Sequence, residues 1–144
     1  MKKETSFYIR ELILIHELKD KFDVLDSEQV KFLLDWLEQQ FEIPWGQIDW
    51  SKVSQSKSIK ISKWENHQLT QYLSSLSLPN KSLNWSIVWS DAECGISIPF
   101  QLACDFIGEL WYPSKSDIWM IEPEKKVCVE ITHESVLSYA ILAE

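Results

Sequence analysis

Apolar residues recur at helical spacing through the first half of the chain. The first series consists of Tyr8, Leu12, Ile15, Leu18 and Phe22. Its steps of three and four residues predict a helix over residues 6–22. A second helical pattern begins after Asp26, which has the position of an N-cap with Gln29 three residues further on. This pattern stops before Pro44, because proline cannot continue a helix.

Two further helices are expected later in the chain. Ser62 and Glu65 have the spacing of a capping box before "NHQLTQYLSSL", and Pro79 ends that pattern. Helical spacing resumes in "SIPFQLACDFIGELW", where Ser97 is the expected N-cap and Pro99 falls in the first turn. The sequence therefore predicts a fourth helix that runs from this cap to the end of the segment.

Strand patterns dominate the second half. Residues 83–90, "LNWSIVWS", alternate in the manner of a half-buried strand, and residues 127–132 do the same. Residues 118–121 are apolar at every position, which predicts a strand buried on both faces. The polar residues 123–126 between them predict a hairpin loop. A short alternating segment, "SIKIS" at residues 58–62, predicts an edge strand.

These elements together predict an α+β fold in which N-terminal helices pack on a small, mainly antiparallel C-terminal sheet. The tail "SVLSYAILAE" fits either a last strand or a short helix. The chain has 144 residues, of which 45% are hydrophobic and 12% aromatic. We therefore expect a single domain over residues 1–144 whose core needs neither disulfides nor a metal.

The distribution of apolar and cysteine residues favours a cytoplasmic protein. No apolar run approaches the roughly 18 to 20 residues that a membrane-spanning helix needs, and charged residues interrupt the N-terminal apolar segment, so no signal peptide is expected. Cys94, Cys104 and Cys128 are odd in number and lack C-x-x-C spacing. The sequence thus predicts three reduced, mostly buried thiols rather than a disulfide framework or a zinc site.

The charge balance narrows the choice of partner. The chain has 14 Lys and Arg against 22 Asp and Glu, a formal net charge of −8, and Arg10 is its only arginine. Binding to nucleic acid requires a basic surface, so no nucleic-acid partner is expected. The acidic balance either keeps the protein soluble or complements a basic protein partner and speeds association with it.

Motifs of catalysis and cofactor binding are absent from the sequence. Gly46, Gly95 and Gly108 are isolated, so no glycine-rich phosphate-binding loop is present, and there is no G-x-S-x-G nucleophile motif. His16 and Asp20 have i,i+4 spacing, but two ligands do not define a metal site. The sequence therefore predicts no catalytic residue, no cofactor and no bound metal.

The adjacent His133 and Glu134 follow the last clear strand and are the one candidate for a catalytic pair. Neighbouring residues on an extended chain point to opposite faces, so these two side chains do not easily serve one substrate. We interpret them as the end of a hairpin strand, with a structural or partner-contact role. A small hydrolase or metal-dependent enzyme that uses His133 and nearby carboxylates is the alternative function.

The second predicted helix carries the best candidate for a binding surface. Its polar side consists of Glu28, Lys31, Asp35, Glu38, Gln39 and Glu42. Phe32 and Trp36 lie one turn apart at the edge between this side and the expected core. They either extend a wide buried stripe or act as aromatic anchors ringed by charge, as in many protein interfaces.

A second candidate surface is "ELWYPSKSD", in which Trp111, Tyr112 and Asp117 surround a polar turn. The longer stretch "WYPSKSDIWMIEPEKKVCVEITHES", with its aromatic strand, "PEKK" turn and "ITHE" strand end, resembles the small immunity proteins of bacterial contact-dependent growth inhibition and related polymorphic toxin systems. That resemblance implies a protein that binds a cognate toxin domain, often a nuclease with a basic active-site surface, and blocks it.

We therefore expect a cytoplasmic immunity protein that neutralises its toxin by binding and without catalysis. The residues expected to contact the toxin are Glu28, Phe32, Asp35, Trp36, Glu38, Glu42, Trp111, Tyr112 and Asp117. An adaptor subunit of a larger complex would differ from this hypothesis only in its partner. The sequence leaves the oligomeric state open.

Overall fold

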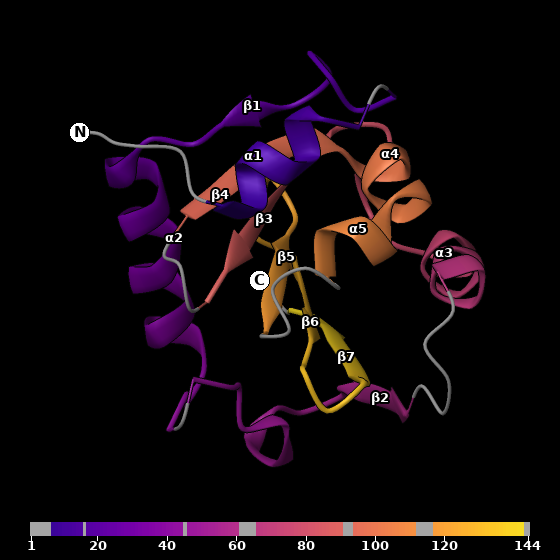
Figure 1. Cartoon of the computed structure of the whole chain (residues 1–144). Helices are drawn as coiled ribbons and strands as arrows, with labels where there is room; N and C mark the ends of the chain where they lie inside the picture. The colour runs from indigo at the N-terminus through magenta and orange to yellow at the C-terminus, as the bar shows by residue number, and fades with distance from the viewer. Residues whose placement is uncertain are drawn as a thin grey trace.

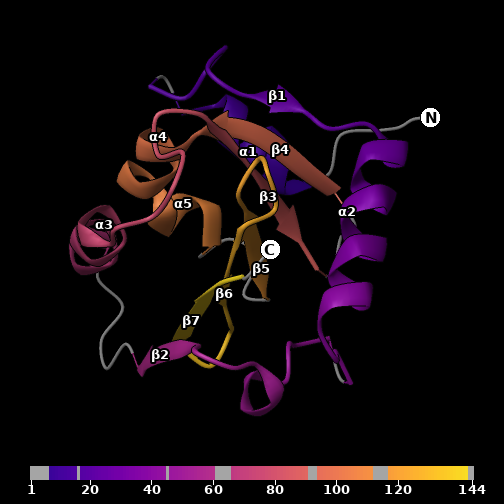
Figure 2. The ribbon, with the colours of Figure 1, turned by 180° about the vertical axis from the view of Figure 1, so that it is seen from behind.

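A central antiparallel sheet with helices on both faces organises the chain (Figure 1; Figure 2). The computed structural model describes residues 7–15, 17–44, 46–60, 66–90, 94–111 and 117–142. Its strands are β1 (Asp23–Val24), β2 (Lys57–Lys60), β3 (Asn84–Trp89), β4 (Cys94–Pro99), β5 (Ile118–Ile121), β6 (Val127–Ile131) and β7 (Val136–Ile141). Its helices are α1 (Phe7–Ile13), α2 (Ser27–Gln40), α3 (Asn66–Ser75), α4 (Phe100–Asp105) and α5 (Ile107–Trp111), with a 3-10 turn, η1 (Trp50–Lys52).

The described strands form one seven-stranded sheet in the order β1-β4-β3-β5-β6-β7-β2. Every pairing between these strands is antiparallel. The α+β class is therefore confirmed. The sheet is neither small nor confined to the C-terminal part, because β1 and β2 come from the first half of the chain and helices α3, α4 and α5 alternate with strands along it.

The strand register divides the side chains between two cores. One face of the sheet packs against α1, α3, α4 and α5, and its buried strand residues are Trp85, Ile87, Trp89, Ile96, Ile98, Ile118, Met120, Val127, Val129, Ile131 and Leu137. The other face packs against α2, and its buried strand residues are Val88, Trp119, Ile121 and Cys128. In Figure 1, α2 lies to one side of the strands, and α3, α4 and α5 lie to the other.

Helix α2 begins as its sequence predicts. The backbone N–H of Gln29 donates to Oδ1 of Asp26 (2.8 Å), and the N–H of Asp26 donates to Oε1 of Gln29 (2.8 Å). This reciprocal capping box satisfies two N–H groups at the helix start. Val30, Leu33 and Leu37 then bury one side of the helix against the sheet.

The first predicted helix is much shorter than expected. Helix α1 ends at Ile13, and tight turns replace the rest of the predicted helix before β1. In these turns Ile15 N–H donates to Leu12 O (3.0 Å), and Asp20 has a left-handed backbone (φ 65°) that no regular helix tolerates. The third helix is confirmed over residues 66–75, while the predicted cap residues Ser62 and Glu65 lie outside the described residues.

The predicted fourth helix is wrong in its first part. Residues 94–99 form strand β4, and the helical spacing begins only at Phe100, after Pro99, whose position has no side-chain cap hydrogen bond. Residues 94–99 form a strand because this conformation places Ile96 and Ile98, both fully buried, in the core between the sheet and the helices. Two short helices, α4 and α5, then occupy the remainder of the segment.

The C-terminal hairpins are largely as predicted. Strand β5 is buried on both faces, and the turn at residues 123–126 joins it to β6. Strand β6 was expected to be half-buried, but all five of its residues are buried because α2 covers its second face. The tail, which the sequence left open, forms strand β7.

The three cysteines are thiols, as predicted. Cys104 and Cys128 are buried and Cys94 is half-buried. Burial raises the pKa of Cys104 to about 12 and the pKa of Cys128 well above its ordinary value. Among the described helices, none has both the length and the apolar character that crossing a membrane requires.

Gly95 provides a test of strand β4. A Cβ atom at this position would lie 2.7 Å from the carbonyl oxygen of Ile87 in the neighbouring strand and 3.1 Å from Cδ1 of Leu25. We therefore expect Gly95→Ala to lower the free energy of unfolding by about 1 to 3 kcal/mol, as overpacking does in well-packed cores. Urea denaturation followed by tryptophan fluorescence measures this change. Ser97→Ala, on the same face of β4, is the control and should have little effect; equal stabilities of the two variants would contradict the close approach.

Candidate partner-binding surface

The polar side of α2 is exposed along its whole length, as the sequence predicts. Glu28, Lys31, Asp35, Glu38 and Gln39 are all exposed. Glu42 is exposed as well, but it lies beyond the end of the helix, because α2 ends at Gln40 and Phe41 is extended. Two of the four carboxylates already have a cation beside them: Lys31 Nζ lies 2.7 Å from Asp35 Oδ2, and Lys52 Nζ lies 2.8 Å from Glu42 Oε1. Within the described parts of the chain, Glu28 and Glu38 form no salt bridge. Neither carboxylate is therefore part of an ion pair here, although the charge of Glu38 also helps to raise the pKa of Lys31.

The two flanking aromatic residues of α2 differ in their surroundings. Trp36 is half-buried, and its ring meets the ring of Phe41 edge to face at a centroid distance of 6.2 Å. Phe32 is 60% exposed. The ammonium group of Lys125, from the β5–β6 turn, lies 5.0 Å from the centroid of the Phe32 ring. The wide buried stripe thus includes part of Trp36 but not Phe32.

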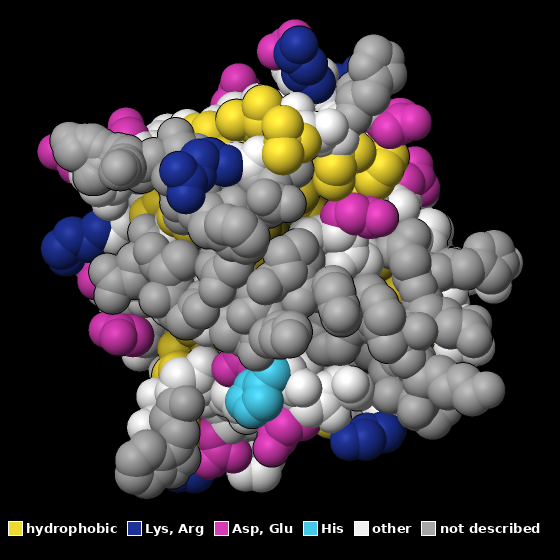
Figure 3. Space-filling model, viewed as in Figure 1, with side chains coloured by type: hydrophobic (Ala, Val, Ile, Leu, Met, Phe, Trp, Pro, Cys, Tyr) yellow, Lys and Arg dark blue, Asp and Glu magenta, His cyan; other side chains and the backbone are white. Residues whose placement is uncertain are grey.

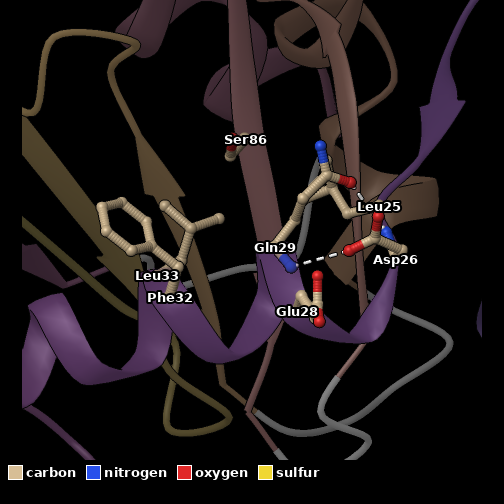
Figure 4. Close-up of a pocket in the computed structure, with 7 residues that line it drawn as sticks. All are labelled: Leu25, Asp26, Glu28, Gln29, Phe32, Leu33 and Ser86. Carbon is tan, nitrogen blue, oxygen red and sulfur yellow. Dashed lines mark hydrogen bonds between the residues drawn. The ribbon is translucent and has the colours of Figure 1, made fainter.

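A shallow hollow of about 350 Å³ lies beside Phe32, between the first turns of α2 and strand β3 (Figure 4). Its lining residues are Leu25, Asp26, Glu28, Gln29, Phe32, Leu33 and Ser86. Figure 4 shows the Phe32 ring at one end of this group and Leu25 at the other, with Ser86 behind them on the strand. The hollow therefore combines apolar walls with two carboxylates.

A second hollow, of about 300 Å³, lies at the other end of α2. It is lined by Glu38, Gln39, Gln40, Phe41, Glu42, Asp49, Lys52 and Val53. Three of these residues are acidic, and Lys52 is already paired with Glu42. Both ends of the helix thus present a concave surface with acidic residues at its edge.

Exposed apolar side chains also occur on the opposite layer of the molecule. Ile13 and Leu14, at the end of α1, are 44% and 77% exposed. Figure 3 shows hydrophobic side chains gathered near α1 and α4, with acidic and basic side chains distributed around the edge of that face. The outer side of α2 differs because its exposed aromatic residue, Phe32, lies next to a hollow that is also lined by the carboxylates of Asp26 and Glu28.

A buried carboxylate fixes the segment that follows α2. Oε2 of Glu130 accepts hydrogen bonds from the backbone N–H of Ile48 (2.8 Å) and from Nε1 of Trp119 (2.9 Å). Its Oε1 accepts from Nε1 of Trp50 (2.7 Å). Glu130 is 1% exposed, and burial raises its pKa, although the three hydrogen bonds act in the opposite direction. The carboxylate thereby links two strands of the sheet to the loop after α2.

The candidate pair His133 and Glu134 lies in the turn between β6 and β7, as the hairpin interpretation predicts. Asp117 Oδ1 accepts from the backbone N–H of His133 (3.0 Å) and lies 3.1 Å from its Nδ1. Gln47 Nε2 is 3.4 Å from both the Asp117 carboxylate and the His133 ring. These contacts hold the turn against the start of β5.

The second predicted surface is only partly described. Trp111 ends α5, but its side chain and the whole of Tyr112 lie outside the described residues. Asp117 is only 5% exposed, and its carboxylate is engaged by His133. A contact between these residues and a partner stays a prediction.

No metal centre is formed by the part of the chain that the structure describes: it contains no group of three or more His, Cys, Asp and Glu side chains able to hold an ion. His16 and the side chain of His67 lie outside the described residues.

Comparison with known proteins identifies the family. Residues 14–140 match the sequence profile of the family described as CdiI immunity protein EcoliA0-like. The chain belongs to the CdiI immunity protein family. The resemblance noted in the sequence is thereby confirmed. The matched region contains α2 and all of the sheet except Ile141, the last residue of β7, whereas α1 precedes it. Membership in this immunity protein family implies a cognate toxin protein as the partner. A search of curated proteins returned no match.

Sequence reasoning missed two features that lie beside α2. Glu130 looked like the solvent-facing residue of an alternating strand, and only the tertiary packing of α2 on that face reveals its burial. Lys125 was part of a polar turn, and nothing local indicated that its side chain reaches Phe32, which is 93 positions away in the chain. Both features depend on contacts between distant segments.

Replacement of Glu130 tests this linkage. In Glu130→Gln one carboxylate oxygen becomes an NH2 group, which cannot accept from Trp or backbone N–H, so at least one buried donor loses its partner. We expect the free energy of unfolding at neutral pH to fall by about 1 to 3 kcal/mol. Urea denaturation measures it. Glu134→Gln, an exposed change in the next turn, is the control; comparable stability of both variants would show that the carboxylate has no anchoring role.

The pH dependence of stability gives a second readout at Glu130. Because burial raises its pKa above the ordinary value of 4.5, the folded chain holds a proton that the unfolded chain has lost within the window between the two values. The contribution of Glu130 to the free energy of unfolding should therefore decrease as the pH rises through that window and stay constant above it. Denaturation curves at successive pH values should show this decrease in the native protein relative to Glu130→Gln. A difference independent of pH would contradict it.

Proposed function

We propose that this CdiI-family protein neutralises its cognate toxin by binding a basic toxin domain through the outer side of α2, without catalysis. The observation that carries the proposal is the 60% exposure of Phe32 beside a hollow whose lining includes Glu28, a carboxylate outside the salt bridges of the described residues. Exposed aromatic residues surrounded by polar groups commonly dominate binding energy in protein interfaces. Glu38, ten residues further along the helix, places a second carboxylate outside the ion pairs of the described residues at the other hollow.

The net charge supports a basic partner, such as a nuclease-type toxin domain. A formal charge of −8 on a chain of this size produces a long-range attraction for a basic surface and raises the association rate. Of the acidic residues predicted for this surface, Asp35 and Glu42 form salt bridges with lysines, whereas Glu28 and Glu38 have no salt-bridge partner among the described residues. We therefore assign the larger electrostatic contribution to the latter pair.

The surroundings of His133 favour binding over chemistry. Its Nδ1 and its backbone N–H both face the Asp117 carboxylate, and these contacts join the β6–β7 turn to the start of β5. These contacts support a structural role for His133 in the hairpin. The enzyme alternative would use the same contact as a histidine–aspartate dyad, in which the carboxylate orients the imidazole. The two hypotheses therefore make opposite predictions for the activity of a His133 variant.

Charge reversal on α2 tests the binding surface. We expect Glu28→Lys/Glu38→Lys to lower the association rate with the cognate toxin domain by about 10-fold at low ionic strength, because rim charges act mainly on diffusional encounter. Surface plasmon resonance at two salt concentrations measures the rate. Glu17→Lys, an exposed reversal in the turns after α1, is the control. Equal effects of the control and of the double reversal would remove α2 from the interface.

Replacement of His133 separates binding from catalysis. We expect His133→Ala to lose about 1 kcal/mol of stability with its contacts to Asp117, and to keep full protection of cells that express the toxin. Growth of toxin-expressing cells and a denaturation curve of the purified variant measure the two effects. Loss of protection by a variant that folds and still binds the toxin would favour the enzyme alternative.

A further inference from the structure

A lysine of the same chain, Lys125, already lies over the ring of Phe32. Lys125 Nζ lies 5.0 Å from the ring centroid, a distance at which the negative face of an aromatic ring attracts an ammonium group. Lys125 belongs to the β5–β6 turn, where its left-handed backbone (φ 62°) and the hydrogen bond from its N–H to Glu122 O (2.8 Å) fix the main chain. Its flexible side chain therefore connects this turn to α2.

The hollow beside the ring suits the side chain of a lysine or arginine. Leu25 and Leu33 offer apolar contacts for an aliphatic stem, and Glu28, one helical turn before Phe32, offers a carboxylate without a salt-bridge partner in the described parts of the chain. The hydroxyl group of Ser86 lies at the strand side of the hollow as a polar contact. An apolar anchor would leave the Glu28 carboxylate unpaired, whereas a cationic side chain satisfies it.

We propose that a lysine or arginine side chain of the toxin inserts beside Phe32 and replaces Lys125 on the aromatic ring. This inference rests on the proposed function and specifies the chemistry of its contact. Lys125 then acts as an internal occupant of the ring face that competes with the partner. Its removal frees the ring and also removes a positive charge from the site where the toxin places its own.

The competition predicts opposite signs for two substitutions. Phe32→Leu keeps an apolar side chain but removes the aromatic face, and we expect the dissociation constant for the cognate toxin domain to rise by about 3- to 10-fold. Lys125→Met keeps the length of the side chain but removes its charge, and we expect the dissociation constant to fall by about 2- to 10-fold. In the double variant, the gain from Lys125→Met should shrink because the ring is absent.

Isothermal titration calorimetry with the purified toxin domain measures all four proteins, and urea denaturation confirms that each variant is folded. Lys125→Arg is the matched control, since it retains the cation and should bind like the native protein. If Lys125→Met binds the toxin domain with the same affinity as the native protein, or more weakly, the inference is wrong. The proposed function still holds in that case, because the complex forms. Failure of the native protein to bind the toxin domain would instead overturn the proposed function and, with it, the inference.

Discussion

The buried carboxylate of Glu130 is the constraint on which the α2 layer depends. A carboxylate with almost no exposure is costly unless its oxygens are satisfied, and here three N–H donors from Ile48, Trp50 and Trp119 meet it. Trp50 in turn packs on Phe41 at a ring distance of 5.8 Å, and Phe41 meets Trp36 of α2. Contacts between aromatic rings thus connect the hydrogen-bonded Trp50 to the C-terminal part of α2. The Glu130 carboxylate, on the sheet, thereby helps to determine which side of α2 faces outward.

The sequence was most informative where one local rule was enough to decide. The capping box at Asp26 and the hairpin between β5 and β6 depend on neighbouring residues, and both are confirmed. It was least informative for β1 and β4. The strand β1 has only two residues, and β4 contains Gly95 and Pro99, which on their own do not favour a strand. Pairing with β3 and burial of two isoleucines override these local preferences.

The candidate surface was predictable in its charges but not in their pairing. Helical periodicity correctly placed the carboxylates of α2 on its outer side, because the opposite side had to be buried. Periodicity does not show which carboxylates have a cation nearby: Lys52 lies ten residues after Glu42 and comes close through the loop that Glu130 anchors. The contact between His133 and Asp117 is of the same kind, since it joins positions 16 residues apart across a hairpin.

Phe32 is an exposed aromatic residue that the fold of α2 tolerates. Phe32 contributes little to the core, so its exposure costs the fold little, and the Lys125 side chain shields part of its ring at the price of ordering a flexible side chain. The cation belongs to a turn whose backbone is held by Glu122, a carboxylate that is fully buried and accepts from the Lys126 N–H (2.6 Å) and from Asn80. A turn whose backbone is held by hydrogen bonds therefore places the Lys125 ammonium group against α2. Exchange of that charge for one from a partner requires the rearrangement of a single side chain, while the sheet and both cores keep their structure.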